Sequence, residues 1–518
     1  MVAAGTVCRV PSETVLVAAA ADESPAEASG RRWAERSAPA WAVWAALGGL
    51  TAIAFVLRVV FVGQQSLGYE ETFTASIVSH SSVAGVWRGV KDTESTPPLY
   101  YLVTWLWVKL VGGHGEAALR GTSLLAGCAT VPIAFLAIRQ FVDRRLALVA
   151  ALLCAISPEL VGYSIYARSY ALVVLVSAVS VWTLGLLLQR QTWRRWILWA
   201  AAAVMCVWTH YFLGFLVLAE GVVLLVQLHG ARRRLLLSFG AIVIAVAPLL
   251  PLFVSQRSAS ERTAFIASRP LTGRLEQLVR QFAMGANVPT AWLEAAGVAL
   301  VVAAVSFGLV RTRRTRATQV FATLALLGGG LPILSAATGV DDHFLARNIL
   351  GIWICAAPLA AYGLTRARGI PLLAYSVICI ATVIAVQSNW RYQAATDWRG
   401  ASARIHARAI GTAVAVMPGQ ELPIAEYYLD RAPLGTPIRT EDLWVMVEPQ
   451  RGAGQRALNP VPNPPLAQLW GAQLRPVAEI DYRGFRMIHL RAIVPITVLP
   501  APASNGPSVN PFAFVLGP

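Results

Sequence analysis

Two adjacent carboxylates, Glu70 and Glu71, lie in the segment "SLGYEETFTA" (66–75), which directly follows a long apolar run. Other polar side chains stand in the same way at the ends of later apolar runs. They are Lys91 to Glu94 in "KDTESTPPLYY", Arg168, His210, Asp341, Asp342, His343 and Arg347. Carboxylates and histidines can accept a proton, and arginines can stabilise an anion. Gathered in one place, these groups suit the transfer of a group from a lipid phosphate to an acceptor.

The chain has the composition of a membrane protein. Of its 518 residues, 56% are hydrophobic and 14% are charged, and the mean hydropathy is +0.57, which indicates several transmembrane helices. The net charge of +16 comes mostly from arginines in short clusters between the apolar runs. That placement is typical of cytoplasmic loops and argues against a nucleic-acid-binding protein. The six cysteines show no CxxC spacing, which argues against a disulfide framework or a zinc site.

Apolar runs near the length of about 20 residues that crosses a bilayer predict eleven spanning helices. They lie at 41–63, 118–139, 146–164, 170–188, 195–209, 211–228, 235–255, 291–310, 317–337, 347–364 and 370–387. The positive-inside rule places the arginine clusters between them in the cytoplasm. The N-terminus is then cytoplasmic, the C-terminus is extracytoplasmic, and the polar side chains named above lie on the outer face. The loop 256–290 departs from the rule, because it carries five arginines on the outer side.

The segment "PLYYLVTWLWVKLVG" (98–112) is apolar but short, and a crossing there would invert every later loop. We interpret it as an interfacial or re-entrant helix on the outer face. Its Trp and Tyr side chains are then expected to form an interfacial belt.

The chain divides into three parts. Residues 1–40 predict a flexible cytoplasmic tail, and 41–387 predict a transmembrane domain with a first outer loop at 64–117. From 388 to 518 no spanning run remains, which predicts a small extracytoplasmic α/β domain. Within it, "QELPIAEYYLD" and "VAEIDYRGFRMIHLRAIV" show strand-like alternation, and Gly484 marks a hairpin turn. The expected fold class is an all-α polytopic membrane protein with a small C-terminal α/β domain.

Several motifs, taken in order, resemble the GT-C membrane glycosyltransferases. They are "GYEET" after the first span, "TPPLYY" before the short apolar segment, "YARSYAL", "ARNILGIWICAAPLAAYGL" and "TDWRGASARI" (396–405). The resemblance covers residues from about 40 to 400 and is strongest to glycosyltransferase family 39 and its bacterial mannosyltransferase-like relatives. It implies a GT-C-like fold in a bacterial plasma membrane.

The resemblance also implies a reaction, in which a sugar, here a mannose-like hexose, passes from a polyprenyl-phosphate donor to an acceptor hydroxyl. The acceptor is an envelope glycan, a glycolipid or a protein outside the cytoplasm. Family members hold their catalytic base in an acidic pair, usually Asp-Glu, so Glu70 takes the Asp place and Glu71 the Glu place. Thr96 stands where a His is common, and because family members differ in metal use, a divalent metal stays open.

The residues receive roles in this scheme. Glu70 accepts the acceptor proton in a single inverting displacement, and Arg168 and Arg347 bind the leaving phosphate, for which a guanidinium is well shaped. The accessory candidates on the same face are Tyr166, Tyr170, His210, Asp341, Asp342 and His343. The chain has no GxxxxGK[ST] and no strand-led GxGxxG, in keeping with a lipid-linked donor.

Each residue also has a simpler interpretation. The acidic pair is then a solvated loop edge, and Arg168 reaches from a helix end to the membrane surface. Arg347 is then a helix-end anchor or a partner of Asp341 or Asp342, and the "DDH" segment is either solvated or a metal ligand set.

Glu220 lies deep within the predicted span 211–228, where a carboxylate is costly unless it stays protonated or pairs, with Arg58 as one candidate. A buried acid of this kind is typical of transporters, so a transporter or flippase of lipid-linked saccharides is the alternative from another class. A non-catalytic relative that binds a lipid-linked sugar is a further alternative. The concentration of charges at outer helix ends favours the enzyme.

Overall fold

The computed structural model describes residues 39–228, 230–259, 262–393, 395–406, 413–417, 422–431, 435–449, 474–498 and 514–516. The chain divides into two units, Met1–Ala46 and Leu47–Pro518. The predicted tail at 1–40 lies almost wholly outside the described residues, and the first unit is described only at the start of α2 (Ala40–Val59). All that follows concerns the second unit.

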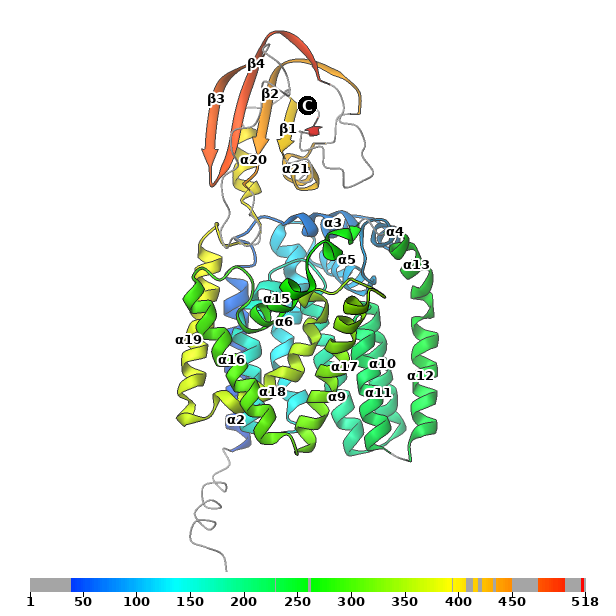
Figure 1. Ribbon diagram of the computed structural model, residues 1–518. Coiled ribbons are helices and arrows are strands. Elements are labelled where there is room, and N and C mark those ends of the chain that lie inside the picture. The colour runs from blue at the N-terminus through cyan, green and yellow to red at the C-terminus, as the bar shows by residue number, and fades with distance from the viewer. Residues whose placement is uncertain are drawn as a thin grey trace, which may run out of the picture. The chain divides into compact units, whose positions relative to one another are not determined.

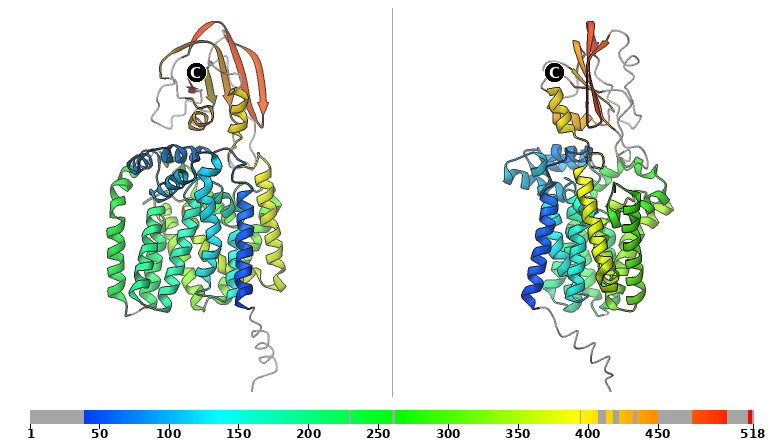
Figure 2. Two further views of the ribbon diagram at one scale, coloured as in Figure 1. Left: turned by 180° about the vertical axis from the view of Figure 1, so that it is seen from behind. Right: turned by 90° about the vertical axis from the view of Figure 1, so that its left-hand side faces the viewer.

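Long apolar helices make up most of the second unit. Among the described residues, eight helices are long and apolar enough to cross a membrane, or nine if the bent pair α7 and α8 is one span. Helices α6, α9 to α12 and α16 to α19 run side by side (Figures 1 and 2). The bounds are α6 (Glu116–Ile138), α7 (Arg144–Ile156), α8 (Pro158–Ser164), α9 (Tyr170–Gln189), α10 (Trp193–Thr209), α11 (Leu213–Gln227), α12 (Arg232–Val246), α16 (Ala291–Thr312), α17 (Arg316–Thr338), α18 (Trp353–Leu364) and α19 (Ile370–Ser388). Short 3₁₀ segments η3 (Ala346–Ile352) and η4 (Ala367–Gly369) precede α18 and α19.

Each of the eleven predicted spans corresponds to a helix, but not every helix is a full span. Helices α10 and α11 have 17 and 15 residues, fewer than the roughly 20 that a crossing needs. The span predicted at 146–164 is bent by 56° between α7 and α8. Pro158 begins α8 and has no N–H to continue the α7 ladder, which explains the break.

Small residues allow α16 and α18 to approach closely. A side-chain carbon on Gly363 would lie 2.3 Å from the Ala304 carbonyl oxygen, and one on Gly308 would lie 2.5 Å from that of Leu359. Close backbone contact of this kind is a common way for helices to associate in a membrane, where burial of apolar area gives little drive.

Three shorter helices, α3 (Tyr69–Val78), α4 (Val83–Thr93) and α5 (Leu99–Val111), lie across one end of the bundle (Figure 1). At 13 residues α5 is too short for a crossing, as predicted for 98–112. The expected aromatic belt is wrong for two of its members. Tyr100 and Tyr101 are fully buried, and Tyr100 forms a hydrogen bond of 2.9 Å with Ser123 of α6.

Helix α12 continues through η1 (Ala247–Leu249) into α13 (Leu250–Ser258). The arginine-rich segment 256–290 begins at the end of α13 and contains α14 (Ala264–Ala267) and α15 (Leu271–Met284), at that same end of the bundle. Most of its arginines have anionic or carbonyl partners. Arg257 pairs with Asp341, Arg274 with Asp342, and Arg280 with Glu294. Because these arginines form contacts with neighbouring elements, their number does not indicate on which side of the membrane this loop lies.

The C-terminal segment forms a small α/β structure. Its sheet has the order β3-β4-β2-β1-β5, with β1 and β2 parallel and the other pairs antiparallel. The elements are α20 (Trp398–His406), β1 (Ala413–Met417), α21 (Leu422–Leu429), β2 (Ile438–Val447), β3 (Leu474–Tyr482), β4 (Phe485–Val498) and β5 (Phe514–Leu516). A buried cluster joins α20 and α21 to one face of the sheet.

The two strand predictions here have different outcomes. The predicted hairpin is present, with Tyr482 opposite Phe485 and Gly484 in the turn at φ +88°. The strand predicted in "QELPIAEYYLD" is wrong, because residues 422–429 form α21. The buried Ala425 and Leu429 are four residues apart, which is helical spacing that the alternation concealed.

Candidate active site

Glu70 lies in the first turn of α3, where the helix dipole favours a negative charge. Its Oε1 is 2.8 Å from Nη1 of Arg347, and its Oε2 is 3.8 Å from Nε of Arg168. Oε2 is buried and forms no hydrogen bond with any described residue. Burial acts to raise the pKa of Glu70, but the charges of Arg347 and Arg168 outweigh burial and lower that pKa. Glu70 is therefore an ionised carboxylate with one oxygen free to accept a proton.

Arg168 is held by two acids at once. Its Nη1 and Nη2 lie 2.5 and 2.7 Å from the two carboxylate oxygens of Glu94, a bidentate pair, and all these atoms are buried. Nη1 also donates to the Glu70 carbonyl oxygen at 3.2 Å, and the guanidinium lies 6.0 Å from the ring centroid of Tyr101. Glu94 ends α4, so this pair fixes α4 against the segment between α8 and α9.

Arg347 reaches Glu70 from η3, a short irregular helix. Gly351 lets η3 lie against α9, since an added side-chain carbon would be 2.2 Å from Oγ of Ser177. The Arg347 guanidinium lies 5.5 Å from the ring centroid of Tyr170, and its buried Nε forms no hydrogen bond with a described residue. Arg347 therefore pairs with Glu70 and not with Asp341 or Asp342, the partners that the simpler interpretation named.

Glu71 occupies a separate, fully bonded position. Its two oxygens accept from Nε and Nη2 of Arg120 at 2.8 and 2.7 Å, from the Gly68 amide at 2.8 Å and from the Ala167 amide at 2.6 Å. Both Glu71 and Arg120 are buried. Arg120 also donates to the carbonyl oxygens of Val62, Gln65 and Ser66. The two neighbouring acids thus differ, because Glu71 has its acceptor positions filled and Glu70 does not.

Aromatic side chains and one histidine line the same region. The ring centroids of Tyr163 and Tyr170 are 4.7 Å apart, and those of Tyr163 and Tyr166 are 6.5 Å apart. Burial raises the pKa of Tyr166, so its phenol keeps its proton. Burial, with the charges of Arg347 and Arg168, lowers the pKa of His210 to about 3. His210 is therefore neutral at neutral pH and adds no cation to the site.

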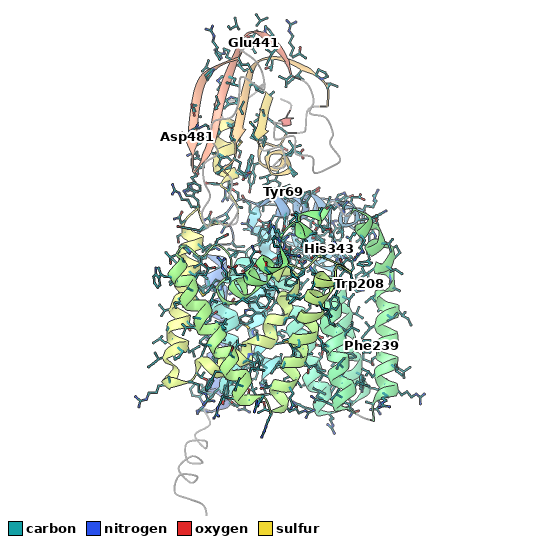
Figure 3. All side chains as sticks on the ribbon, viewed as in Figure 1. Tyr69, Trp208, Phe239, His343, Glu441 and Asp481 are labelled. Atoms are coloured by element: carbon teal, nitrogen blue, oxygen red, sulfur yellow. The ribbon has the colours of Figure 1, made fainter. Side chains whose placement is uncertain are left out.

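The segment Asp341 to His343 belongs to a different network. Asp341 pairs with Arg257 and with His343, while Asp342 accepts from both Nη atoms of Arg274. The Arg274 hydrogen bond lowers the pKa of Asp342. His343 lies at the same end of the bundle as Tyr69, the residue next to Glu70 (Figure 3). In the described ranges, no three His, Cys, Asp or Glu side chains are grouped so that they could hold a metal ion.

Two functional neighbours were given no role by sequence reasoning. Glu94 stands in the polar stretch before "TPPLYY", but nothing local shows that its partner is Arg168, 74 positions later. Arg120 lies inside an apolar run, and a buried arginine in such a run is itself a signal that a carboxylate is near. Thr96 forms a hydrogen bond of 3.3 Å with the Tyr101 hydroxyl.

The Glu220 and Arg58 pair suggested by the sequence is also wrong. Oε2 of Glu220 accepts from Ser180 and from the Trp199 indole at 2.7 and 2.8 Å. Arg58 instead donates to Ser164 and to the carbonyl oxygens of Ala54, Ala155 and Cys154.

Comparison with known proteins gives one family and a set of solved structures. Residues 95–255 match the family model described as dolichyl-phosphate-mannose-protein mannosyltransferase. No curated protein matches the chain. The crystal structure of ArnT from Cupriavidus metallidurans bound to undecaprenyl phosphate is similar, with 14% identity and a TM-score of 0.57 over 88% of this chain and 98% of that chain. The apo structure of the same protein gives 14% identity and a TM-score of 0.54 over 87% and 98%. At this identity the likeness is one of fold.

Proposed function

We propose that this chain, a member of the GT-C superfamily of membrane glycosyltransferases, transfers a sugar from a polyprenyl-phosphate donor to an acceptor hydroxyl. The sugar is a hexose of the mannose type, and the acceptor is an envelope glycan, a glycolipid or a protein. The reaction takes place on the extracytoplasmic face of a bacterial plasma membrane. In this proposal the end of the bundle that carries α3 lies on that face. The N-terminus is then cytoplasmic and the C-terminal α/β structure extracytoplasmic.

Glu70 is the base in this proposal. The acceptor oxygen attacks the anomeric carbon, the bond from that carbon to the phosphate oxygen breaks with its electron pair, and the acceptor proton passes to the carboxylate of Glu70. The single displacement inverts the configuration at the anomeric carbon. The observation that carries this role is the buried Oε2 of Glu70, which has no hydrogen-bond partner among the described side chains, in a carboxylate that lies beside two arginines.

Arg347 and Arg168 stabilise the leaving phosphate. Glu70, Glu94, Arg168 and Arg347 together carry no net charge, so the empty site does not repel the monoanionic phosphodiester of the donor. As the bond breaks, the phosphate gains negative charge while Glu70 loses its own by accepting the proton. Arg347 is thereby released from Glu70 and can turn toward the phosphate at the moment when its charge grows.

In this scheme Glu71 is a positioning residue for Glu70. Because its carboxylate is bonded to Arg120 and to two backbone amides, it joins the start of α3 to α6 and to the segment after α8. A residue with its acceptor sites filled is a poor proton acceptor but a good anchor for the neighbouring Glu70.

The experiment that tests the proposal uses purified full-length protein, a panel of polyprenyl-phosphate hexoses and envelope acceptors. Wild type is compared with Glu70→Gln and with the control Glu276→Gln, which alters an exposed acid on α15. We expect transfer by wild type and by the control, and loss of transfer in Glu70→Gln. Absence of transfer with every donor would instead support a flippase or a non-catalytic sugar-binding protein.

A further inference from the structure

The loop at 62–68, between α2 and α3, leads directly into Glu70 and is held chiefly by side chains. Part of this support is Arg120, as described above. Further support comes from Arg399 in the "TDWRG" motif. Nη2 of Arg399 donates to the carbonyl oxygens of Gly63 and Gln64 at 3.1 and 3.0 Å, and its backbone amide donates to Oγ of Ser66 at 3.0 Å. The "TDWRG" motif has no role in the proposed reaction itself. It binds the loop that precedes Glu70.

Tyr428 of α21 provides a second contact to the same loop. Its hydroxyl accepts from the Leu67 amide at 2.6 Å and donates to Oε1 of Glu116 at 2.9 Å. Glu116 begins α6 and also pairs with Arg399 at 3.4 Å. The two contacts from the C-terminal α/β structure therefore meet on one residue of α6, a single turn before Arg120.

The motif is built to hold Arg399 in this position. Asp397 accepts from the Gly400 amide at 3.0 Å, from the Tyr482 hydroxyl at 2.6 Å and from Nη1 of Arg483 at 2.6 Å. An added side-chain carbon on Gly400 would lie 2.4 Å from the Tyr482 oxygen and would displace that hydroxyl from Asp397. Trp398 is buried in the cluster between the helices and the sheet. The start of α20 is therefore fixed on both sides of Arg399.

We infer that Arg399 and Tyr428 are positioning residues for Glu70, so that the C-terminal α/β structure is required for proton transfer in the membrane domain. This inference rests on the proposed function. Once its backbone groups are bonded at Gly63, Gln64 and Leu67, the loop has little freedom to move. Without these bonds, displacements of about 1 Å at Glu70 would be enough to cost on the order of a hundredfold in rate.

The test compares each positioning residue with a matched neighbour. Tyr428→Phe removes one hydroxyl from the loop, and its control Tyr427→Phe removes a hydroxyl that bonds the His114 carbonyl oxygen instead. Arg399→Gln removes the guanidinium from the loop, and its control Arg491→Gln removes an exposed guanidinium that pairs with Asp442 of β2. Arg399→Lys keeps a cationic donor.

The first readout is hydrogen exchange in the peptide covering residues 63–72, which needs no sugar donor. We expect faster exchange in Tyr428→Phe and Arg399→Gln, an intermediate rate in Arg399→Lys, and wild-type rates in both controls. Unchanged exchange in Tyr428→Phe and Arg399→Gln would overturn the inference whether or not a donor has been found.

The second readout is the kinetics of transfer with any donor that wild type uses. We expect kcat to fall about tenfold or more in Tyr428→Phe and Arg399→Gln while KM for the donor changes less than about twofold. Arg399→Lys should recover part of kcat. A rise in KM with kcat unchanged, or equal losses in the control variants, would contradict a positioning role.

Discussion

Oε1 of Glu70 and Nη1 of Arg347 lie 2.8 Å apart and join α3 to η3 across the end of the helical bundle. The carboxylate that we assign as the base is therefore paired with an arginine that we assign to the phosphate. The pair is about one-quarter exposed, so substrate can reach it. This one contact links proton transfer to departure of the phosphate, and most of the predictions below depend on it.

Removing the charge of Glu70 should strengthen binding of the product. In Glu70→Gln, Arg347 no longer neutralises a carboxylate, and undecaprenyl phosphate should bind about three- to tenfold more tightly, in line with about 1 kcal/mol for a partly exposed pair. Arg347→Gln should weaken binding. Titration of each variant with undecaprenyl phosphate in detergent measures both, and weaker binding in Glu70→Gln would show that Arg347 does not exchange partners.

The ionisation of Glu70 should lie at unusually low pH. Arg347 and Arg168 outweigh burial and lower its pKa, so the carboxylate stays charged as pH falls through about 4.3, the usual Glu value. The kcat/KM of transfer reports the ionisation of the free enzyme, so kcat/KM should fall only below that pH. When Arg347 is replaced, the pH below which the residual activity falls should be higher than in wild type. An infrared titration of the Glu70 carboxylate, with Glu70→Gln as the blank, checks the assignment, and a midpoint above about 4.3 would contradict it.

Arg168 should not be replaceable by lysine. Its two Nη atoms bind both oxygens of Glu94, and a lysine ammonium cannot reproduce that fork. We expect Arg168→Lys to weaken undecaprenyl phosphate binding about tenfold, because Glu94 then competes for the single ammonium. Arg491→Lys, at the exposed pair with Asp442, is the control and should bind like wild type. Equal affinities of wild type and Arg168→Lys would remove Arg168 from the phosphate site.

The Arg120 and Glu71 pair should matter mainly for stability. Arg120→Ala leaves a buried carboxylate and three loop carbonyl oxygens without their donor, so we expect a loss of about 3–5 kcal/mol in unfolding free energy. Arg491→Ala, at the exposed pair with Asp442, should cost about 0–1 kcal/mol. Thermal unfolding in detergent compares the two variants. Similar melting temperatures would show that the buried pair contributes no more than a surface pair.

Much of the bundle could be predicted because hydropathy is local. Each apolar run reports its own helix, as at 118–139 and 170–188, where α6 and α9 lie. The short α5 could be told from a span by its length and by the inversion of every later loop that a crossing there would cause. The strand prediction for "QELPIAEYYLD", which covers all of α21, is wrong because eight residues show too few periods to separate a helix from a strand.

The site could be predicted only in part. Glu70, Arg168 and Arg347 were identified because each stands at a helix end, and the fold does bring them together. The different states of Glu70 and Glu71 could not be read from the sequence, because they depend on Arg120 and on the amide of Ala167. Asp341, Asp342 and His343 looked similar in the sequence, yet the two aspartates pair with arginines of α13 and α15, and His343 pairs with Asp341.

The most direct test of the account is a paired measurement on Glu70→Gln, of sugar transfer and of undecaprenyl phosphate binding in the same preparation. We predict that transfer falls by about a hundredfold or more, the range expected for a missing general base, while binding is kept or strengthened. Glu276→Gln should behave as wild type in both. If Glu70→Gln transfers sugar at the wild-type rate, Glu70 is not the base and the central claim is wrong.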